Sequence, residues 1–209
     1  MNTYHKIQTI FKRDMSNHGQ LIEGQFSDPV IEFLKDNRWV FTEKVDGTNI
    51  RVMWDGQEIT FGGKTDNAQI PATLFKKLQD LFKNRESDFK EMFEEEGGVC
   101  LYGEGYGVKI QSGGNYIPDG VDFVLFDIKI GDWWLKREDI EDIAQKLGLK
   151  VVPIINEGTI SDMIEMTKQG FNSRWGDFIA EGIVARPSVE IRDRRGHRII
   201  TKIKYKDFH

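Results

Sequence analysis

The chain has 209 residues, of which 39% are hydrophobic, and a formal net charge of -5. This is the composition of a globular protein that can bury a substantial core. No apolar stretch approaches the eighteen or so residues that a membrane helix requires, and the first residues lack the apolar run of a secretory signal. We therefore expect a cytoplasmic protein with no membrane partner.

The single cysteine, Cys100, excludes an internal disulfide and any metal site built from several cysteines. Its apolar neighbours predict that it lies in a buried strand. The four histidines show no ligand spacing and indicate no metal site.

The predicted elements begin with short strands. Segments rich in Val, Ile, Phe and Trp cover residues 38–47, 50–54 and 58–61, and the Asp55-Gly56 turn between the last two predicts a hairpin. Apolar residues then recur at helical spacing from Leu74 to Phe93. They predict one long or broken amphipathic helix that ends in the segment 94–98.

The second half of the chain contains more predicted strands than helices. The strands cover residues 99–102, 121–130, 149–155, 182–186 and 198–205, and the helices lie around 140–147 and 163–166. Because strands and helices do not alternate, we expect an α+β fold of mixed, mainly antiparallel sheets with flanking helices, not a doubly wound sheet. No change of composition marks a boundary, so we expect one domain over residues 1–209.

Two glycine-rich segments resemble phosphate-binding loops but fail their patterns. Gly62-Gly63-Lys64-Thr65 ends like a P-loop, yet Glu58 stands where the first glycine is required. The run from Gly103 to Gly107 has Val108 in place of the third glycine of a dinucleotide fingerprint. A P-loop ATPase, a Rossmann enzyme and a kinase are therefore not supported.

Charged residues at the ends of predicted strands carry the chemistry that remains. Lys44, in Lys44-Val45-Asp46-Gly47, is placed like a nucleophile, and a lysine attacks only as the neutral amine. Glu104 lies between glycines that would let the backbone approach a ligand, and its carboxylate could accept hydrogen bonds from sugar hydroxyls. Glu181 opens a strand and could bind a cation or hold the lysine.

A basic tract covers residues 186–206 near the end of this acidic chain. Within it, Lys202 and Lys204 alternate along a strand, so both side chains point to one face and could clamp a polyphosphate. The same pattern also fits an edge strand that lysines protect against aggregation.

In chain order, these segments resemble the motifs of the covalent nucleotidyltransferase superfamily, which includes DNA and RNA ligases and mRNA capping enzymes. The match consists of Lys44-Val45-Asp46-Gly47, Tyr102-Gly103-Glu104-Gly105, the strand Phe123–Ile128, Glu181–Arg186 and Lys202-Ile203-Lys204. Asn49, where DNA ligases and capping enzymes usually carry Arg, and the closing Lys204-Tyr205-Lys206-Asp207-Phe208 are similar to the ATP-dependent RNA ligase branch.

The resemblance implies a ligase-type adenylation domain that uses ATP with Mg²⁺ or Mn²⁺. Lys44 would attack the α-phosphate of ATP and form lysyl-AMP. The AMP would pass to the 5′-phosphate of an RNA end, and a 3′-hydroxyl would then displace it and seal the strand. Whether the ends belong to single strands or a nicked duplex stays open.

The resemblance also implies a role for individual residues. The catalytic residues would be Lys44, Lys202, Lys204 and Glu181. The nucleotide would be bound by Glu43, Asn49, Lys64, Glu104 and Phe126, with Phe126 stacking on adenine unless it is plain core. Asp46 and Glu181 would hold the metal ion through waters.

Many relatives append an OB-fold or a helical module, whereas this chain ends five residues after Lys204. We therefore expect a minimal catalytic core whose grip on RNA comes from the basic tract, the N-terminal segment or an accessory protein. Two alternatives stay open. One is the same chemistry with another acceptor, as in a DNA ligase core or a GTP-using capping-type enzyme; the other is a noncatalytic nucleic-acid-binding relative.

Overall fold

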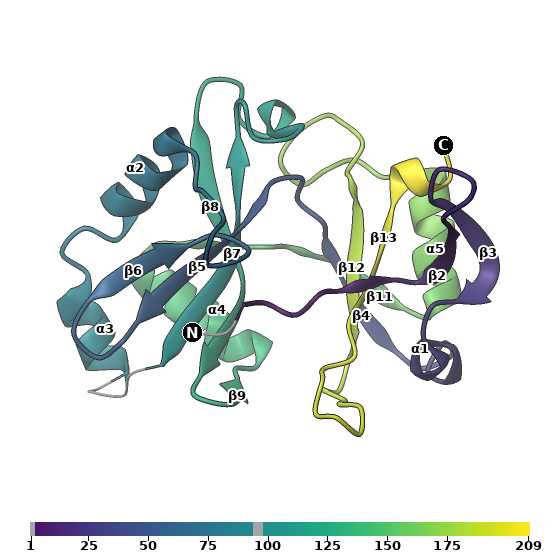
Figure 1. Ribbon diagram of the computed structural model, residues 1–209, viewed down its shortest axis with the longest axis horizontal. Coiled ribbons are helices and arrows are strands. Elements are labelled where there is room, and N and C mark those ends of the chain that lie inside the picture. The colour runs from purple at the N-terminus through teal and green to yellow at the C-terminus, as the bar shows by residue number, and fades with distance from the viewer. Residues whose placement is uncertain (1–2, 94–97) are drawn as a thin grey trace. The chain divides into compact units, whose positions relative to one another are not determined.

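The computed structural model describes residues 3–93 and 98–209 (Figure 1). The chain divides into two compact units. Unit 1 comprises residues 1–5 and 46–152, and unit 2 comprises residues 6–45 and 153–209. Each unit is assembled from two separate segments, so no single cut in the chain separates them. The expectation of one domain over residues 1–209 stays a prediction.

Unit 1 is built on a sheet with the strand order β10-β8-β7-β5-β6, and β9 pairs with β8. Neighbouring strands are antiparallel except β10 and β8, which are parallel. The elements of unit 1 are β5 (Thr48–Trp54), β6 (Ile59–Gly62), α2 (Ala72–Leu81), α3 (Glu86–Phe93), β7 (Val99–Gly107), the 3₁₀ turn η1 (Gly113–Asn115), β8 (Val121–Ile130), β9 (Trp133–Trp134), α4 (Arg137–Leu147) and β10 (Lys150–Val151).

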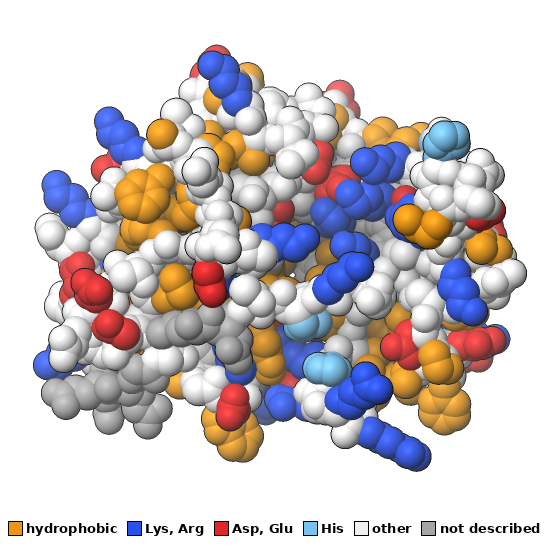
Figure 2. Space-filling model, viewed as in Figure 1, with side chains coloured by type: hydrophobic (Ala, Val, Ile, Leu, Met, Phe, Trp, Pro, Cys, Tyr) orange, Lys and Arg blue, Asp and Glu red, His pale blue; other side chains and the backbone are white. Residues whose placement is uncertain are grey.

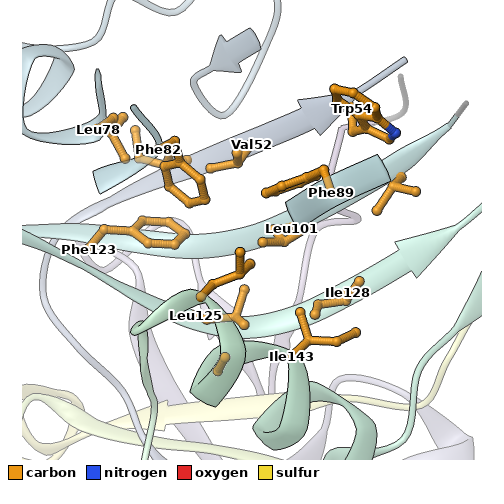
Figure 3. Packing of buried hydrophobic residues seen from close by; sticks show 14 of the residues in the cluster. Val52, Trp54, Leu78, Phe82, Phe89, Leu101, Phe123, Leu125, Ile128 and Ile143 are labelled. Carbon is orange, nitrogen blue, oxygen red and sulfur yellow. The ribbon is translucent and has the colours of Figure 1, made fainter. Parts of the chain in front are cut away.

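One face of this sheet carries the core of unit 1, and α2, α3 and α4 cover it (Figure 3). The labelled side chains of Phe82, Phe89 and Phe123 lie together there with Leu and Ile side chains. Side chains alternate along a strand, so residues between the core positions of β5, β7 and β8 point to the opposite face. That opposite face is where the polar residues of these strands are found.

Unit 2 contains the sheet β1-β13-β12-β4-β11 and the two-stranded sheet β2-β3. In the larger sheet only β1 and β13 are parallel among the described strands. The elements of unit 2 are β1 (Gln8–Thr9), β2 (Phe11–Asp14), β3 (Gln20–Phe26), α1 (Pro29–Phe33), β4 (Trp39–Glu43), β11 (Ile154–Gly158), α5 (Ile160–Gln169), β12 (Gly182–Pro187), β13 (Thr201–Lys204) and the 3₁₀ turn η2 (Tyr205–Asp207).

The core of unit 2 lies between its large sheet and the helices α1 and α5, and Trp39, Phe41, Met163, Ile183 and Ile203 are completely buried in it. The α5 helix starts at a capping box, in which the Thr159 side chain accepts from the Asp162 N–H and the Asp162 carboxylate accepts from the Thr159 N–H. This box fixes the point where the chain turns from β11 into the helix.

The α+β class with mainly antiparallel sheets is confirmed, as is the hairpin of β5 and β6. The predicted helix from Leu74 to Phe93 is broken into α2 and α3, with Asn84 in the left-handed region at φ 58° between them. Residues 94–97 of its predicted end at 94–98 lie outside the described residues.

The predicted strand 149–155 is wrong as one element. It is two strands in different sheets, β10 and β11, because the chain passes from unit 1 to unit 2 between Val152 and Pro153. The strand predicted at 99–102 continues to Gly107 instead, since Gly103 and Gly105 lie against the core. A Cβ at Gly103 would be 2.3 Å from the Phe123 ring, and one at Gly105 would be 2.3 Å from Leu74.

Cys100 is buried in β7, as predicted, with 2% of its surface exposed. Within residues 3–93 and 98–209, no helix has both the length and the apolar character needed to cross a bilayer.

Candidate active site

Lys44 lies directly after β4 in unit 2, where its side chain meets a carboxylate shared with a second lysine. The Lys44 Nζ is 2.5 Å from one oxygen of Glu181, and the Lys204 Nζ is 2.5 Å from the other. The three side chains are 18%, 11% and 24% exposed, respectively. This arrangement presents an amine at a partly open surface beside a second positive charge, with one carboxylate holding both.

Backbone hydrogen bonds set this geometry. The Lys44 N–H donates to the Gly182 carbonyl over 2.9 Å, and the Tyr205 N–H donates to the Glu181 carbonyl over 2.8 Å. The start of β12 is thereby bonded to the end of β4 on one side and the end of β13 on the other. A Cβ at Gly182 would lie 2.1 Å from the Ile203 carbonyl oxygen, so this close approach requires glycine.

Lys202 precedes Lys204 by two residues in β13, and both are half-buried while Thr201 and Ile203 are buried. The predicted shared face of the two lysines is therefore confirmed. β13 pairs with β12 along its length and with β1 at Thr201 and Lys202, so at Lys202 it is an inner strand, which argues against the alternative that this lysine protects an open edge. Figure 2 shows basic side chains gathered over β12 and β13, with acidic ones among them.

Glu43, the last residue of β4, is 1% exposed, and its carboxylate is fully engaged. One oxygen accepts from the Ser173 hydroxyl over 2.6 Å and the other from the Arg174 N–H over 2.8 Å. Burial raises the pKa of Glu43 despite these bonds. The Glu43 side chain thus ties the segment around residue 173 to the strand that carries Lys44.

Unit 1 contributes a second group of predicted site residues on the sheet face opposite its core. Asn49 of β5 and Glu104 of β7 are directly paired in the sheet, and the Asn49 Nδ2 donates to a Glu104 oxygen over 2.9 Å. Both side chains are half-buried. An acceptor carboxylate oriented by an amide and open to solvent is suited to bind hydroxyl groups.

Asp46 lies just before β5 and is anchored at both its backbone and its side chain. Its N–H donates to the Tyr116 hydroxyl over 3.1 Å, and its carboxylate accepts from the Ser112 N–H over 3.2 Å. The next residue, Gly47, packs against β7, where a Cβ would be 2.3 Å from the Gly105 carbonyl oxygen. The Asp-Gly pair therefore links the start of β5 to the strand that carries Glu104.

Lys64 is exposed in the loop after β6. A buried arginine, Arg51, holds this loop: its Nε donates to the Gly63 carbonyl over 2.9 Å and its Nη2 to Asp66 over 2.7 Å. The guanidinium keeps the pKa of Asp66 below its usual value. No role for Arg51 is predicted from the sequence, whereas in the structure it holds the backbone that bears Lys64.

Phe126 is the extra residue of a bulge in β8. Tyr102 pairs with Asp127 and Gly103 with Leu125, which leaves Phe126 without a partner on β7. Its ring is half-buried and lies 5.1 Å from the Tyr4 ring at 79°. Phe126 as a whole is half-buried, so it is not a fully buried core residue, and its stacking on adenine stays a prediction.

The predicted residues thus fall into two groups. Unit 2 brings together Lys44, Glu181, Lys204 and, on the same strand face, Lys202, while Glu43 supports them. Unit 1 pairs Asn49 with Glu104 and holds Asp46, Lys64 and Phe126 at separate points of its sheet. The chain joins the groups covalently, because only Val45 separates Lys44 from Asp46.

Several supporting residues were not predicted from the sequence: Tyr4, Ser112, Tyr116, Ser173 and Asp207. The Asp207 carboxylate accepts from the Lys204 N–H over 3.0 Å and pairs with Arg13 of β2 over 2.8 Å. The sequence signal that could have identified Asp207 is its place in the closing Lys-Tyr-Lys-Asp-Phe segment. The others act across long sequence separations and leave no local pattern.

In the described part of the chain, no cluster of three His, Cys, Asp or Glu side chains could hold a metal ion. A hydrated Mg²⁺ needs only one or two carboxylates from the protein, so the predicted role of Asp46 and Glu181 in holding the metal ion through waters stays a prediction.

The fold resembles solved structures of the Naegleria gruberi RNA ligase. A substituted form with ATP and Mn aligns with a TM-score of 0.68 at 20% identity, over 98% of this chain and 56% of that one. A form without ligand gives 0.65 at 19% identity, over 100% and 59%. A form with AMP and Mn gives 0.63 at 21% identity, over 84% and 52%. The chain thus spans little more than half the length of these proteins.

The sequence pattern of the RNA ligase family matches residues 37–205, which run from just before β4 into η2. The matched stretch contains Lys44, Glu104, Glu181, Lys202 and Lys204. The chain belongs to the RNA ligase family.

Proposed function

We propose that this protein is an ATP-dependent RNA ligase that carries AMP on Lys44. The observation that supports this most strongly is the Lys44–Glu181–Lys204 cluster within the stretch that matches the RNA ligase family. A nucleophilic lysine that transfers a phosphoryl group must be fixed in position beside positive charge, and this cluster provides both conditions.

In the first step, the Lys44 Nζ attacks the α-phosphorus of ATP. A P–N bond forms, the P–O bond to pyrophosphate breaks and leaves its electron pair on pyrophosphate, and the amine passes a proton to the Glu181 carboxylate, 2.5 Å from Nζ. Glu181 orients the amine, and the ammonium groups of Lys204 and Lys202 stabilise the negative charge that develops on the phosphate oxygens. Lys64 contacts the terminal phosphates.

The nucleoside is bound by residues of unit 1. Glu104, oriented by Asn49, accepts hydrogen bonds from the ribose hydroxyls, and Phe126 stacks on adenine. The segment around Glu43 borders the adenine edge. A divalent cation, which Asp46 and Glu181 would hold through waters, would supply positive charge at the phosphates. The Naegleria gruberi RNA ligase structures with ATP and Mn support the choice of ATP as the nucleotide and the choice of a divalent cation.

In the later steps, AMP moves from Lys44 to the 5′-phosphate of an RNA end, and the 3′-hydroxyl of another end displaces it. We propose that the basic tract of residues 186–206, the N-terminal segment or an accessory protein helps to grip the RNA during sealing.

Intact-mass measurement after separate incubation with ATP, GTP and NAD, each with Mg²⁺, tests the nucleotide. We expect an added AMP with ATP only, its loss in Lys44→Ala, and normal labelling of the exposed-lysine control Lys136→Ala. A GTP adduct would indicate a capping-type enzyme, and no adduct with any nucleotide would favour a noncatalytic relative. Joining of 5′-phosphorylated RNA but not DNA ends would separate an RNA ligase from a DNA ligase core.

A further inference from the structure

The N-terminal segment places an aromatic ring on the strand that carries Phe126. Tyr4, which belongs to unit 1, lies with its ring centroid 5.1 Å from Phe126, 5.1 Å from Tyr102 and 5.5 Å from Trp134. The contacts with Phe126 and Trp134 are nearly perpendicular, at 79° and 82°. Aromatic rings favour this edge-to-face arrangement, which fixes the tilt of each ring relative to its neighbour.

A hydrogen bond holds Tyr4 at this position. Its hydroxyl donates over 2.8 Å to the Oδ2 of Asp127, a side chain with none of its surface exposed. Asp127 pairs with Tyr102 across the sheet and directly follows Phe126. Tyr4 is thus bonded to the residue beside the bulge through its hydroxyl and packed on the bulged residue itself through its ring.

The bulge explains why Phe126 needs such support. With no partner on β7, Phe126 is released from the regular alternation of the strand, and bulges commonly redirect a side chain in this way. Nothing in the ladder of β7 and β8 then fixes the direction of the ring, whereas the edge contact with Tyr4 does.

We propose that Tyr4 is a positioning residue for adenine recognition: it holds the half-buried ring of Phe126 in the orientation that stacks on the base of ATP. This inference rests on the proposed function, which assigns Phe126 to adenine. It adds that residues preceding the family match at 37–205 take part in nucleotide selection.

The test compares ATP with inorganic triphosphate, which lacks the base. For Tyr4→Ala we expect the ATP concentration that gives half-maximal labelling of Lys44 to rise about threefold to tenfold, the range that one lost aromatic pair predicts. Labelling at saturating ATP and inhibition by triphosphate should stay within about twofold of wild type. Tyr4→Phe keeps the ring but loses the hydrogen bond to Asp127, so its half-maximal ATP concentration should lie between those of wild type and Tyr4→Ala.

Two further variants isolate the route through Phe126. In a double-mutant cycle, adding Tyr4→Ala to Phe126→Ala should cause little further loss of ATP affinity, because the ring that Tyr4 positions is already absent. Trp133→Ala is a matched control, since this neighbouring aromatic side chain is 77% exposed; it should behave as wild type.

The outcomes separate this inference from the proposed function. If wild type gains AMP but Tyr4→Ala shows the same dependence on ATP, the inference is wrong and the proposed function stands. Equal weakening of ATP and triphosphate, or losses that add in the double variant, would also overturn it, because Tyr4 would then act on the fold in general. If wild type gains no AMP, the proposed function itself fails.

Discussion

Substitution of Gly47 by alanine tests how the Asp46-Gly47 pair is placed. In the structure, the new Cβ would lie 2.3 Å from the Gly105 carbonyl oxygen, 2.9 Å from the Glu104 Cγ and 3.1 Å from the Gly105 carbonyl carbon. Ordinary contacts of a Cβ lie at 3.4–4 Å. Either β5 or β7 must therefore move by about 1 Å, and such overpacking typically costs about 1–3 kcal/mol.

The displacement would also reach the nucleotide residues. Thr48 pairs with Gly105 and Asn49 with Glu104, so the clash lies beside the 2.9 Å bond between Asn49 and Glu104. We expect Gly47→Ala to lower the free energy of unfolding in urea by about 1–3 kcal/mol, and to raise the ATP concentration needed for labelling.

Gly114→Ala is the matched control, because a Cβ at Gly114 meets nothing within 4 Å and its backbone is not in the left-handed region. Its stability should stay within about 1 kcal/mol of wild type, on the stabilising side if it changes. Equal stability and equal ATP dependence of the two variants would refute the reasoning, since the contact of Gly47 with β7 would then carry no energy.

Three more predictions concern single side chains. Burial raises the pKa of Cys100 to about 11, so about one thiol in a thousand is ionised at pH 8. Alkylation of Cys100 should therefore be at least about a hundredfold slower in the folded protein than in the protein unfolded in urea. Comparable rates in the two states would contradict the burial of Cys100. The pKa of Glu43 is raised in the folded state, so the folded protein holds the carboxyl proton of Glu43 more tightly than the unfolded protein does. The stability that this group contributes therefore declines as pH rises through the raised pKa. Glu43→Gln should flatten that decline at pH values above the ordinary glutamate pKa of about 4.3; an unchanged slope of unfolding free energy against pH would show that another group titrates. Glu181→Ala leaves two partly buried ammonium groups without their shared carboxylate, so unfolding in urea should show a loss of about 1–3 kcal/mol, and AMP labelling should fall. The control Glu157→Ala removes the exposed partner of Arg38 and should lower the free energy of unfolding by less than about 1 kcal/mol. Equal losses in Glu157→Ala and Glu181→Ala would show that the carboxylate shared by Lys44 and Lys204 stabilises the fold no more than a surface ion pair does.

Local patterns in the sequence predict the regular elements well where a strand or helix is long. The strand predicted at 121–130 is β8 with the same bounds, because apolar residues recur along all of it and its ends are marked by Gly120 and Gly131. The strands β1, β2 and β3 have no such signal, whereas α1 is not predicted although Asp28 caps its start and Pro29 lies in its first turn. β1 consists of two residues and exists through pairing with β13, almost two hundred residues later.

The candidate site shows the same division. Lys44, Glu181 and Lys204 could be predicted from the sequence because each lies at the end of a predicted strand or beside it and belongs to a motif of the resembling family. Their supports could not, since Ser173 reaches Glu43 across 130 positions and Tyr4 reaches Asp127 across 123. The glycines beside Glu104 were predicted to let the backbone approach a ligand, but the structure gives them another role, close packing against Phe123 and Leu74.

Peptide mapping of the adduct tests the central claim most directly. After incubation with ATP and Mg²⁺, proteolysis and mass analysis should locate one AMP on the peptide that contains Lys44, and a chase with 5′-phosphorylated RNA should remove it. AMP found on Lys202, Lys204 or any other lysine, or a Lys44 peptide that stays unmodified while RNA is sealed, would contradict the account.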